Sequence, residues 1–344
     1  MKAIVINEFG NESVLKQVEL ETPKPQPGHV LIKILATGLN RFDLYIRAGQ
    51  VAPELPFPHI LGSDAAGEVA ELGEGVTGFS IGERVIPVPG FAAEAEHKDI
   101  RPVTAAPSFA LPGLHRSGTY AQYISVPAYA VVKDNTGLPA EEIATLPVPL
   151  ATGVRAVKVV GGVKAGDKVL IQAGNGAAGS MQIQIAKALG AEVATTVRSA
   201  DLVEFAQSVG ADLVIDTSKD DFVTKVKEWT DGQGADVVID SLGGDVLPKS
   251  IDATRAFGTT VVFGFVAGTE ATFNSQNFFF MQKTLKGSMA SDKEDLEWGL
   301  EQVKAGKIKA SLDRTFALSN AVEAHQFVGK GKVKGNVALL PWSA

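Results

Sequence analysis

A glycine-rich turn, placed between an apolar strand and an amphipathic helix, is the sequence feature that most constrains the fold of this chain. Residues 169–191 read VLIQAGNGAAGSMQIQIAKALGA, and the turn Gly174-Asn175-Gly176-Ala177-Ala178-Gly179 fits the pattern G-x-G-x-x-G. In this pattern the first glycine permits a tight turn, the second lets the backbone approach a pyrophosphate, and the third allows close packing of helix on strand. The N–H groups at the start of the helix favour an anion. We therefore predict a dinucleotide-binding site; the alternative is a glycine-rich turn that binds nothing.

The composition narrows the class of protein. With 344 residues the chain has room for about two domains. Its formal net charge of −7 argues against a nucleic-acid partner, and no apolar run approaches the ~18 residues of a membrane span. The opening residues MKAIVINEFG lack the features of a secretory signal, so we expect a cytoplasmic protein. The lack of cysteine excludes disulfides and thiolate metal ligands.

The order of the expected elements predicts an α/β fold with a second, β-rich domain. From residue 169 onward strands and helices alternate, which is typical of a doubly wound parallel sheet. The first 135 residues are β-rich and broken by Pro and Gly, which predicts an irregular β-barrel. The tail carries two helices and a final strand, 336–340, and is expected to return to the first domain. The six expected sheet strands are 168–173, 192–197, 212–216, 236–240, 259–263 and 284–288, with helices at 179–189, 200–209, 222–229 and 247–253.

One segment fits neither pattern. Residues 89–117, PGFAAEAEHKDIRPVTAAPSFALPGLHRS, show no periodicity, and we interpret them as a loop excursion. Five of their side chains are potential metal ligands without a recognised ligand spacing, so we interpret them as solvated surface charges. These are Glu94, Glu96, His97, Asp99 and His115.

Three N-terminal motifs join the glycine-rich turn in pointing to a known family. They are GLNRFDLYIRAGQ (38–50), PFPHILGSDAAGEVAELGEGVTGFSIGERV (56–85) and GTYAQY (118–123). With them the chain resembles the medium-chain dehydrogenase/reductase superfamily over essentially its full length. The first motif is similar to the N-x-x-D segment of quinone oxidoreductases of the zeta-crystallin type, and the second resembles the superfamily's G-H-E-x-x-G-x-V-x-x-x-G-x-x-V stretch. The resemblance implies a GroES-like catalytic domain over residues 1–125 and 288–344, and a Rossmann domain with a six-stranded parallel sheet over 126–287.

The resemblance also indicates where a zinc ion would bind. Zinc alcohol dehydrogenases of the superfamily hold their catalytic zinc with a Cys, a His and a second Cys, and those positions are here Asn40, Ser63 and Val148. Neither an amide nor an apolar side chain replaces a thiolate, so we expect no metal site. The superfamily's four-cysteine structural zinc lobe corresponds to residues 89–117, which keep the length of the lobe but none of its ligands.

The expected cofactor is NADPH. Arg198 follows the second strand, where NAD-preferring enzymes of this fold carry an acidic residue for the ribose 2′-hydroxyl. Arg198 and Ser199 offer a guanidinium and a hydroxyl to a 2′-phosphate; the alternative is that Arg198 is only a surface arginine. The resemblance implies further cofactor contacts: Thr152 with the nicotinamide carboxamide, Thr217 with the phosphate or adenine, Leu242, Gly264 and Phe265 with the nicotinamide half, and Asn336 from the tail.

The chemistry expected without zinc is hydride transfer to an acceptor that is already activated. In quinones and α,β-unsaturated carbonyls the new charge is delocalised onto an oxygen, which donors need only hydrogen-bond. We expect Asn40 to supply an amide donor and Tyr45 a phenolic proton or hydrogen bond. The alternatives are that Asn40 only caps a helix beginning near Phe42, and that Tyr45 is a core aromatic.

The expected function is therefore zinc-independent, NADPH-dependent reduction of a small-molecule quinone or α,β-unsaturated carbonyl. One alternative is an alcohol dehydrogenase-like enzyme that uses an unrecognised metal. Another is an NADPH-binding protein of low turnover that acts as a sensor. Members of the superfamily often pair through an edge strand, here 284–288, so the resemblance implies a homo-oligomer, a dimer.

Overall fold

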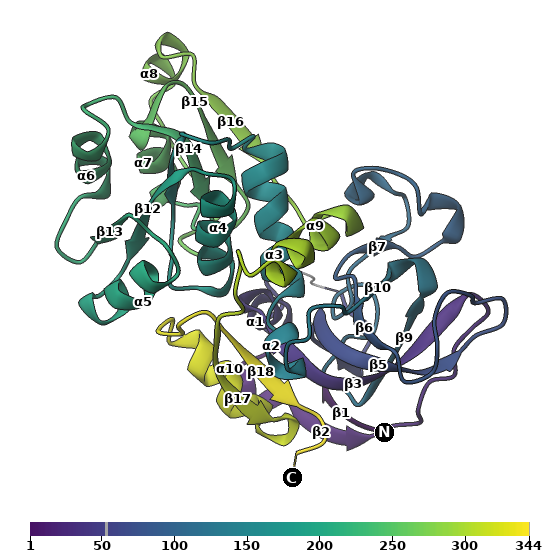
Figure 1. Ribbon diagram of the computed structural model, residues 1–344. Coiled ribbons are helices and arrows are strands. Elements are labelled where there is room, and N and C mark those ends of the chain that lie inside the picture. Colours follow the sequence, from purple (N-terminus) through teal and green to yellow (C-terminus); the bar gives the residue numbers. More distant parts are fainter. Residues whose placement is uncertain (52–53, 344) are drawn as a thin grey trace. The chain divides into compact units, whose positions relative to one another are not determined.

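The computed structural model describes residues 1–51 and 54–343, which form two compact units (Figure 1). The first unit comprises Met1–Ala151, Ala290–Lys304 and Ala310–Ala344, and the second comprises Thr152–Met289 and Ala305–Lys309. The sequence places the domain boundary after residue 125, whereas residues 126–151 group with the first unit. The reason is that strands β9 and β10 in this stretch pair with strands of the first unit's sheet.

Six parallel strands form the sheet of the second unit, in the order β13-β12-β11-β14-β15-β16. The order reverses between β11 and β14 at the centre, which confirms the predicted doubly wound sheet and creates the crevice where such folds bind ligands. The strands are β11 (Lys168–Ile171), β12 (Glu192–Val197), β13 (Leu213–Asp216), β14 (Ala235–Asp240), β15 (Thr254–Val262) and β16 (Thr284–Gly287).

Helices cover both faces of this sheet because its strands are apolar on both sides. Leu170, Ala194 and Ile215 pack against α6 and α7 on one face, while Val197 packs against α5 on the other. Between the strands lie α4 (Ala177–Ala188), α5 (Val203–Ser208), α6 (Phe222–Trp229), α7 (Val246–Ala253) and α8 (Ser275–Phe280).

The first unit is β-rich, as predicted, and is built around the long strand β3 (His29–Leu39). The main sheet has the order β10-β6-β5-β3-β18-β17, with β9 also paired to β3. The C-terminal strand β18 (Asn336–Leu340) runs antiparallel to β3, with Val337 opposite Leu39, so the tail returns to this unit. The other strands are β1 (Lys2–Ile6), β2 (Lys16–Glu19), β4 (His59–Ile60), β5 (Asp64–Leu72), β6 (Arg84–Pro87), β9 (Tyr123–Pro127), β10 (Val131–Lys133) and β17 (Leu312–Ala317).

Two helices of this unit position the candidate catalytic residues. Helix α1 (Arg41–Arg47) follows β3 directly, and helix α10 (Ala321–Gly329) packs beside it. Ile46 of α1 and Ala324 of α10 belong to one buried cluster, so the two helices share a core. The remaining helices are α2 (Ala140–Ile143), α3 (Pro147–Val154), which continues as a π-helical turn (Arg155–Val160), and α9 (Lys293–Lys304).

Residues 89–117 form a small lobe, which corrects the interpretation of this segment as a loop. Strand β7 (Phe91–Ala92) pairs with β8 (Phe109–Ala110), and Ala92, Val103 and Ala106 form a core of their own. The backbone N–H of Val103 donates to the carboxylate of Asp292 at 2.6 Å. A core this small arises from irregularly spaced apolar residues, which is why periodicity does not reveal it.

Candidate functional site

The glycine-rich turn lies at the carboxyl end of β11, beside the point where the strand order reverses. Gly176 is the N-cap residue of α4, and its N–H donates to the carbonyl of Ala173 at 3.0 Å. The N–H groups of the following first turn have no acceptor within the helix. The turn therefore presents backbone donors and the positive end of a helix at the ligand-binding edge of the sheet.

The three glycines of the turn are required for different reasons. A Cβ on Gly174 would lie 2.9 Å from the Ile183 side chain, and one on Gly179 would lie 2.9 Å from the carbonyl carbon of Ala173. A Cβ on Gly176 would meet only the carbonyl oxygen of Ala173, at 3.5 Å. Packing explains Gly174 and Gly179, whereas position 176 has open space, as expected where a ligand approaches the backbone.

The expected 2′-phosphate contacts lie together at neighbouring strand ends. Arg198 is exposed and follows β12, with Ser199 next to it. Thr217 follows β13, and its hydroxyl donates to the carbonyl of Val197 at 3.1 Å. This hydrogen bond places Thr217 beside the residue that precedes Arg198.

The residues expected near the nicotinamide follow β14 and β15 at the same edge. The carboxylate of Asp240 accepts the N–H of Leu242 at 2.7 Å and that of Gly243 at 2.9 Å, which fixes the turn after β14. A Cβ on Gly264 would collide with the carbonyl of Ser241, so the turn before Phe265 packs directly on the turn after β14.

Thr152 lies at the start of the second unit, within α3. The next residue, Gly153, packs against α4, because a Cβ there would lie 2.7 Å from the Ile185 side chain. Thr152 is therefore held beside the helix that begins at the glycine-rich turn.

In the first unit, Asn40 stands at the junction of β3 and α1. It is the N-cap residue of α1 in a capping box, in which the Asp43 carboxylate accepts the backbone N–H of Asn40 at 2.9 Å. Asn40 thus occupies the predicted N-cap position, and its Nδ2 donates to Oδ2 of Asp64 at 2.7 Å. An amide nitrogen carries two hydrogens, and this bond uses one of them.

Asp64 joins two of the positions that hold zinc in metal-dependent relatives. Its Oδ2 accepts from Asn40, and its Oδ1 accepts the backbone N–H of Val148 at 2.7 Å. The hydroxyl of Ser63, at the remaining position, donates to the carbonyl of Pro112 at 2.8 Å. A bonded amide, a serine hydroxyl engaged elsewhere and an apolar valine do not fit a tetrahedral zinc ion.

A chain of buried polar groups leads from Asn40 to the surface. The Tyr120 hydroxyl donates to Asp43 Oδ2 at 2.9 Å, and Nε2 of His325 lies 3.2 Å from that hydroxyl. Nη1 of Arg47 lies 3.0 Å from Nδ1 of His325, and its Nη2 lies 3.6 Å from Glu12. A cavity of about 380 Å³ lies at this outer end, with Glu12, Arg47 and His325 in its wall.

Burial controls the charges in this part of the molecule. Desolvation raises the pKa of Asp43 to about 7 and that of Asp64 to about 8, and the proximity of the two carboxylates adds to the rise at Asp64. Desolvation, followed by the charge of Arg47, lowers the pKa of His325 to about 3. His325 is therefore neutral at neutral pH, and the two buried aspartates take up protons near pH 7 to 8.

The pKa of His325 predicts acid sensitivity. Below its ordinary pKa of 6.5 this histidine binds a proton in the unfolded chain but not in the folded one, so stability falls as the pH drops from 6.5 toward 3. We expect wild type to lose about 2 kcal/mol more unfolding free energy than His325→Gln between pH 7 and pH 5. Urea unfolding at both pH values measures this, with His29→Gln as the control. Equal losses in wild type and His325→Gln would contradict the prediction.

Two further predicted residues lie in the same unit as Asn40. Tyr45 is half-buried in α1. Asn336 comes one step beyond the Val337–Leu39 pair, which places it opposite Asn40 in the antiparallel register. Oδ1 of Asn336 accepts the N–H of Val337 at 2.9 Å, while its buried Nδ2 has no hydrogen-bond partner among the described residues.

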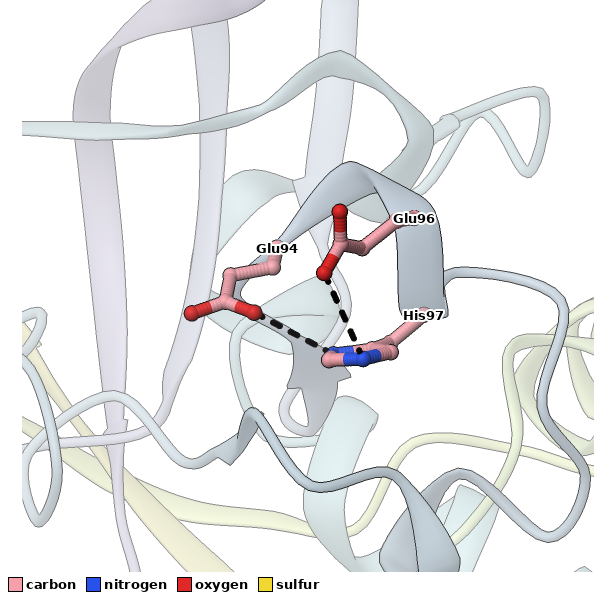
Figure 2. A group of neighbouring side chains, drawn as sticks. All are labelled: Glu94, Glu96 and His97. Carbon is pink, nitrogen blue, oxygen red and sulfur yellow. Dashed lines mark ion pairs between the residues drawn. The ribbon is translucent and has the colours of Figure 1, made fainter.

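An acidic group with one histidine lies in the lobe formed by residues 89–117 (Figure 2). Nδ1 of His97 lies 3.3 Å from Glu94 and its Nε2 lies 3.7 Å from Glu96, while Nδ1 also lies 2.9 Å from the Ser108 hydroxyl. The glutamate side chains are 63% and 77% exposed. The group is explained by surface ion pairs, and it includes neither Asp99 nor His115 of the five candidate ligands.

Comparison with known proteins assigns the family. Residues 26–140 match the alcohol dehydrogenase GroES-like domain, and residues 177–305 match the zinc-binding dehydrogenase domain. The chain belongs to the medium-chain dehydrogenase/reductase superfamily. The zinc-binding dehydrogenase match, over residues 177–305, covers none of the positions Asn40, Ser63 and Val148.

Relatives within the superfamily differ in the activity that their names give. A 2-haloacrylate reductase from a Burkholderia species is 31% identical, over 98% of both chains. A solved NAD-dependent alcohol dehydrogenase is 33% identical with a TM-score of 0.94, over 99% of both chains. A solved quinone oxidoreductase from Coxiella burnetii is 30% identical with a TM-score of 0.82, over 99% of both. The chain is thus an oxidoreductase of this superfamily, and its substrate is a separate question.

Sequence reasoning missed the buried polar chain around Asn40. Asp64 and Tyr120 lie inside the segments GSDAAG and GTYAQY. These segments indicate the family, but they do not by themselves indicate that the two side chains form hydrogen bonds around Asn40. His325 is the polar member of an otherwise apolar helix face that includes Ala321, Ala324 and Val328. A buried histidine at such a position is the signal that could have identified it.

No helix in the described part of the chain is both long enough and apolar enough to cross a membrane.

Proposed function

We propose that this protein is a zinc-independent, NADPH-dependent oxidoreductase that transfers hydride to a quinone or an α,β-unsaturated carbonyl. The observation that carries the proposal is the set of contacts at Asn40, Ser63 and Val148. Asp64 ties the first and last of these together at 2.7 Å each, at positions where metal-dependent relatives hold zinc. A substrate that needs strong Lewis-acid polarisation is therefore poorly served, whereas an activated acceptor needs only hydrogen-bond donors.

The residues of the first unit suit this chemistry. Bound reduced nicotinamide supplies a hydride, and the electron pair that the acceptor gains appears on its oxygen. The second N–H of Asn40 Nδ2 donates to that oxygen, and Tyr45 or solvent supplies the proton that completes the reduction. Because burial raises the pKa values of Asp43 and Asp64, protonation near neutral pH limits the negative charge beside the developing oxyanion.

The experiment that tests the proposal combines metal analysis with an acceptor panel. We expect well under one zinc per chain after purification, and NADPH oxidation on addition of quinones, enals or enones but not of simple ketones. The alcohol dehydrogenase alternative is favoured by the similarity to the NAD-dependent enzyme. It predicts about one zinc per chain that survives mild chelation, together with oxidation of simple alcohols, and either result would overturn the proposal.

The proposed preference for NADPH over NADH rests on Arg198 and Ser199, the two residues that follow β12. Arg198 is exposed at this strand end, with Thr217 close by, and a guanidinium binds a phosphate through paired hydrogen bonds. We expect Arg198→Asp to reverse the preference, because the carboxylate repels the 2′-phosphate and accepts a ribose hydroxyl. Titration calorimetry with NADPH and NADH measures both dissociation constants. Equal constants in wild type would refute the assignment, and Lys249→Asp, at an exposed lysine of α7, controls for the same change of charge elsewhere in the unit.

We also propose a homodimer formed through the outer strand of the second unit. Strand β16 pairs only with β15 among the described strands, so its other edge is open. Phe257, Phe279 and Phe280 in this unit are 66%, 59% and 66% exposed, which is unusual for large apolar side chains. Sedimentation velocity on wild type and Phe280→Asp tests this pairing, and a monomeric wild type would contradict it.

A further inference from the structure

We propose that His325 is a positioning residue for hydride transfer. Together with Tyr120 and Arg47 it fixes the carboxylate of Asp43, and Asp43 fixes Asn40. The inference rests on the proposed function, in which Asn40 holds the acceptor oxygen. Its basis is the direction of the hydrogen bonds in the buried polar chain that runs from Arg47 to Asp43.

The hydrogen bonds of this buried polar chain all run in one direction, which Arg47 sets. A guanidinium can only donate, so Nδ1 of His325, 3.0 Å from Nη1 of Arg47, must be an unprotonated acceptor. The neutral ring then carries its hydrogen on Nε2, which donates to the Tyr120 hydroxyl at 3.2 Å. Tyr120 in turn donates to Oδ2 of Asp43 at 2.9 Å. Each group donates toward Asp43.

The inner end of the buried polar chain lies at the N-terminus of α1, where Asn40 stands. Oδ2 of Asp43 accepts both from Tyr120 and from the backbone N–H of Asn40, at 2.9 Å in each case. Asp43 and Tyr120 are fully buried, and His325 is 1% exposed. The rings of Tyr120 and His325 meet edge to face at 5.7 Å, so packing holds the same geometry as the hydrogen bonds.

The surroundings indicate that the buried polar chain positions Asn40 rather than stabilises the fold. Burying several polar side chains costs desolvation energy that apolar residues of similar size would avoid. The neighbouring Ile46 and Ala324 show that this part of the unit supports an apolar core. The charged groups that face the chain are Arg47 with Glu12 at its outer end, and Asp43 with Asp64 at its inner end.

Two substitutions at one position separate positioning from stability. His325→Leu removes the acceptor for Arg47 and the donor for Tyr120, and we expect it to lower kcat with a quinone on the order of tenfold or more. His325→Gln offers an amide oxygen to Arg47 and an N–H to Tyr120, and we expect it to restore most of kcat. The Kd for NADPH should stay within about twofold in both, since the glycine-rich turn is unchanged. If both variants keep the wild-type kcat and differ only in melting temperature, the inference is overturned.

A second measurement does not depend on turnover. The protein has five histidines, so ¹⁵N-histidine labelling gives five pairs of ring-nitrogen signals, and His325→Gln identifies the pair from His325. We expect a neutral ring protonated on Nε2 that does not titrate between pH 5.5 and 8. A ring protonated on Nδ1, or titration in that range, would overturn the inference. Should Asn40→Ala retain full activity, the catalytic role of Asn40 within the proposed function fails, while the tautomer still tests the hydrogen bonds between Arg47 and Asp43 by itself.

Discussion

Replacing Asn40 with alanine is expected to lower turnover with a quinone by on the order of a hundredfold or more, with little change in NADPH affinity. The reason is the position of the Asn40 amide. Nδ2 is held at 2.7 Å by Asp64 in a site where Asn40 is 6% exposed, so its remaining hydrogen is a donor fixed in direction. A fixed donor in a desolvated site acts mainly on the charge that develops in the transition state.

The competing explanation is that Asn40 serves the fold alone as the N-cap of α1. Loss of a cap costs about 1 kcal/mol of stability and leaves turnover unchanged. Asn40→Ser is the matched control, because serine is a good N-cap but too short to replace the amide. We expect Asn40→Ser to melt close to wild type and to remain slow, like Asn40→Ala. Full activity of Asn40→Ala with a melting temperature a few degrees lower would show that the residue is only a cap. Tyr45→Phe should slow turnover more mildly if solvent replaces the phenolic proton.

The second unit was predictable because its elements alternate with clear periods. The expected strand 192–197 and helix 222–229 coincide with β12 and α6, and all six sheet strands are present. Helix α8 (Ser275–Phe280) was not expected, and among the strands the largest error concerns β15, which begins at Thr254 rather than at residue 259. Its pairing with β14 shifts register near Ala235, and Phe257 has a φ of +59°, so the first half of the strand shows no regular alternation.

Residues of the candidate site could be predicted from the sequence only where a motif or a strand end specifies a single position. Gly176 and Arg198 follow strands whose carboxyl ends meet at one edge of the sheet, so their placement follows from the fold. The partners of Asn40 do not follow in this way. Asp64, Tyr120 and His325 come from three distant segments. The pairing of β5 with β3 places Asp64 opposite Gly38, backbone hydrogen bonds to Leu61 and Ile4 place Tyr120, and the packing of α10 on α1 places His325.

A valine at position 176 is expected to weaken NADPH binding by on the order of a hundredfold or more, about 2.7 kcal/mol, without unfolding the protein. Gly176 has φ −78° and ψ 168°, a backbone conformation that valine adopts readily, and a Cβ there would meet only the Ala173 carbonyl oxygen at 3.5 Å. The fold thus tolerates the side chain, whereas a pyrophosphate on the N-terminus of α4 does not.

Gly179→Ala supplies the opposite control within the same turn. A Cβ at Gly179 collides with the backbone of Ala173, so this variant should lower the melting temperature before it affects the ligand. Calorimetric titration with NADPH, together with thermal unfolding followed by circular dichroism, separates the two effects. We expect Gly176→Val to melt near wild type and bind poorly, and Gly179→Ala to melt early. Normal NADPH affinity in Gly176→Val would mean that the turn only joins β11 to α4, and the cofactor would then have to bind elsewhere on the sheet.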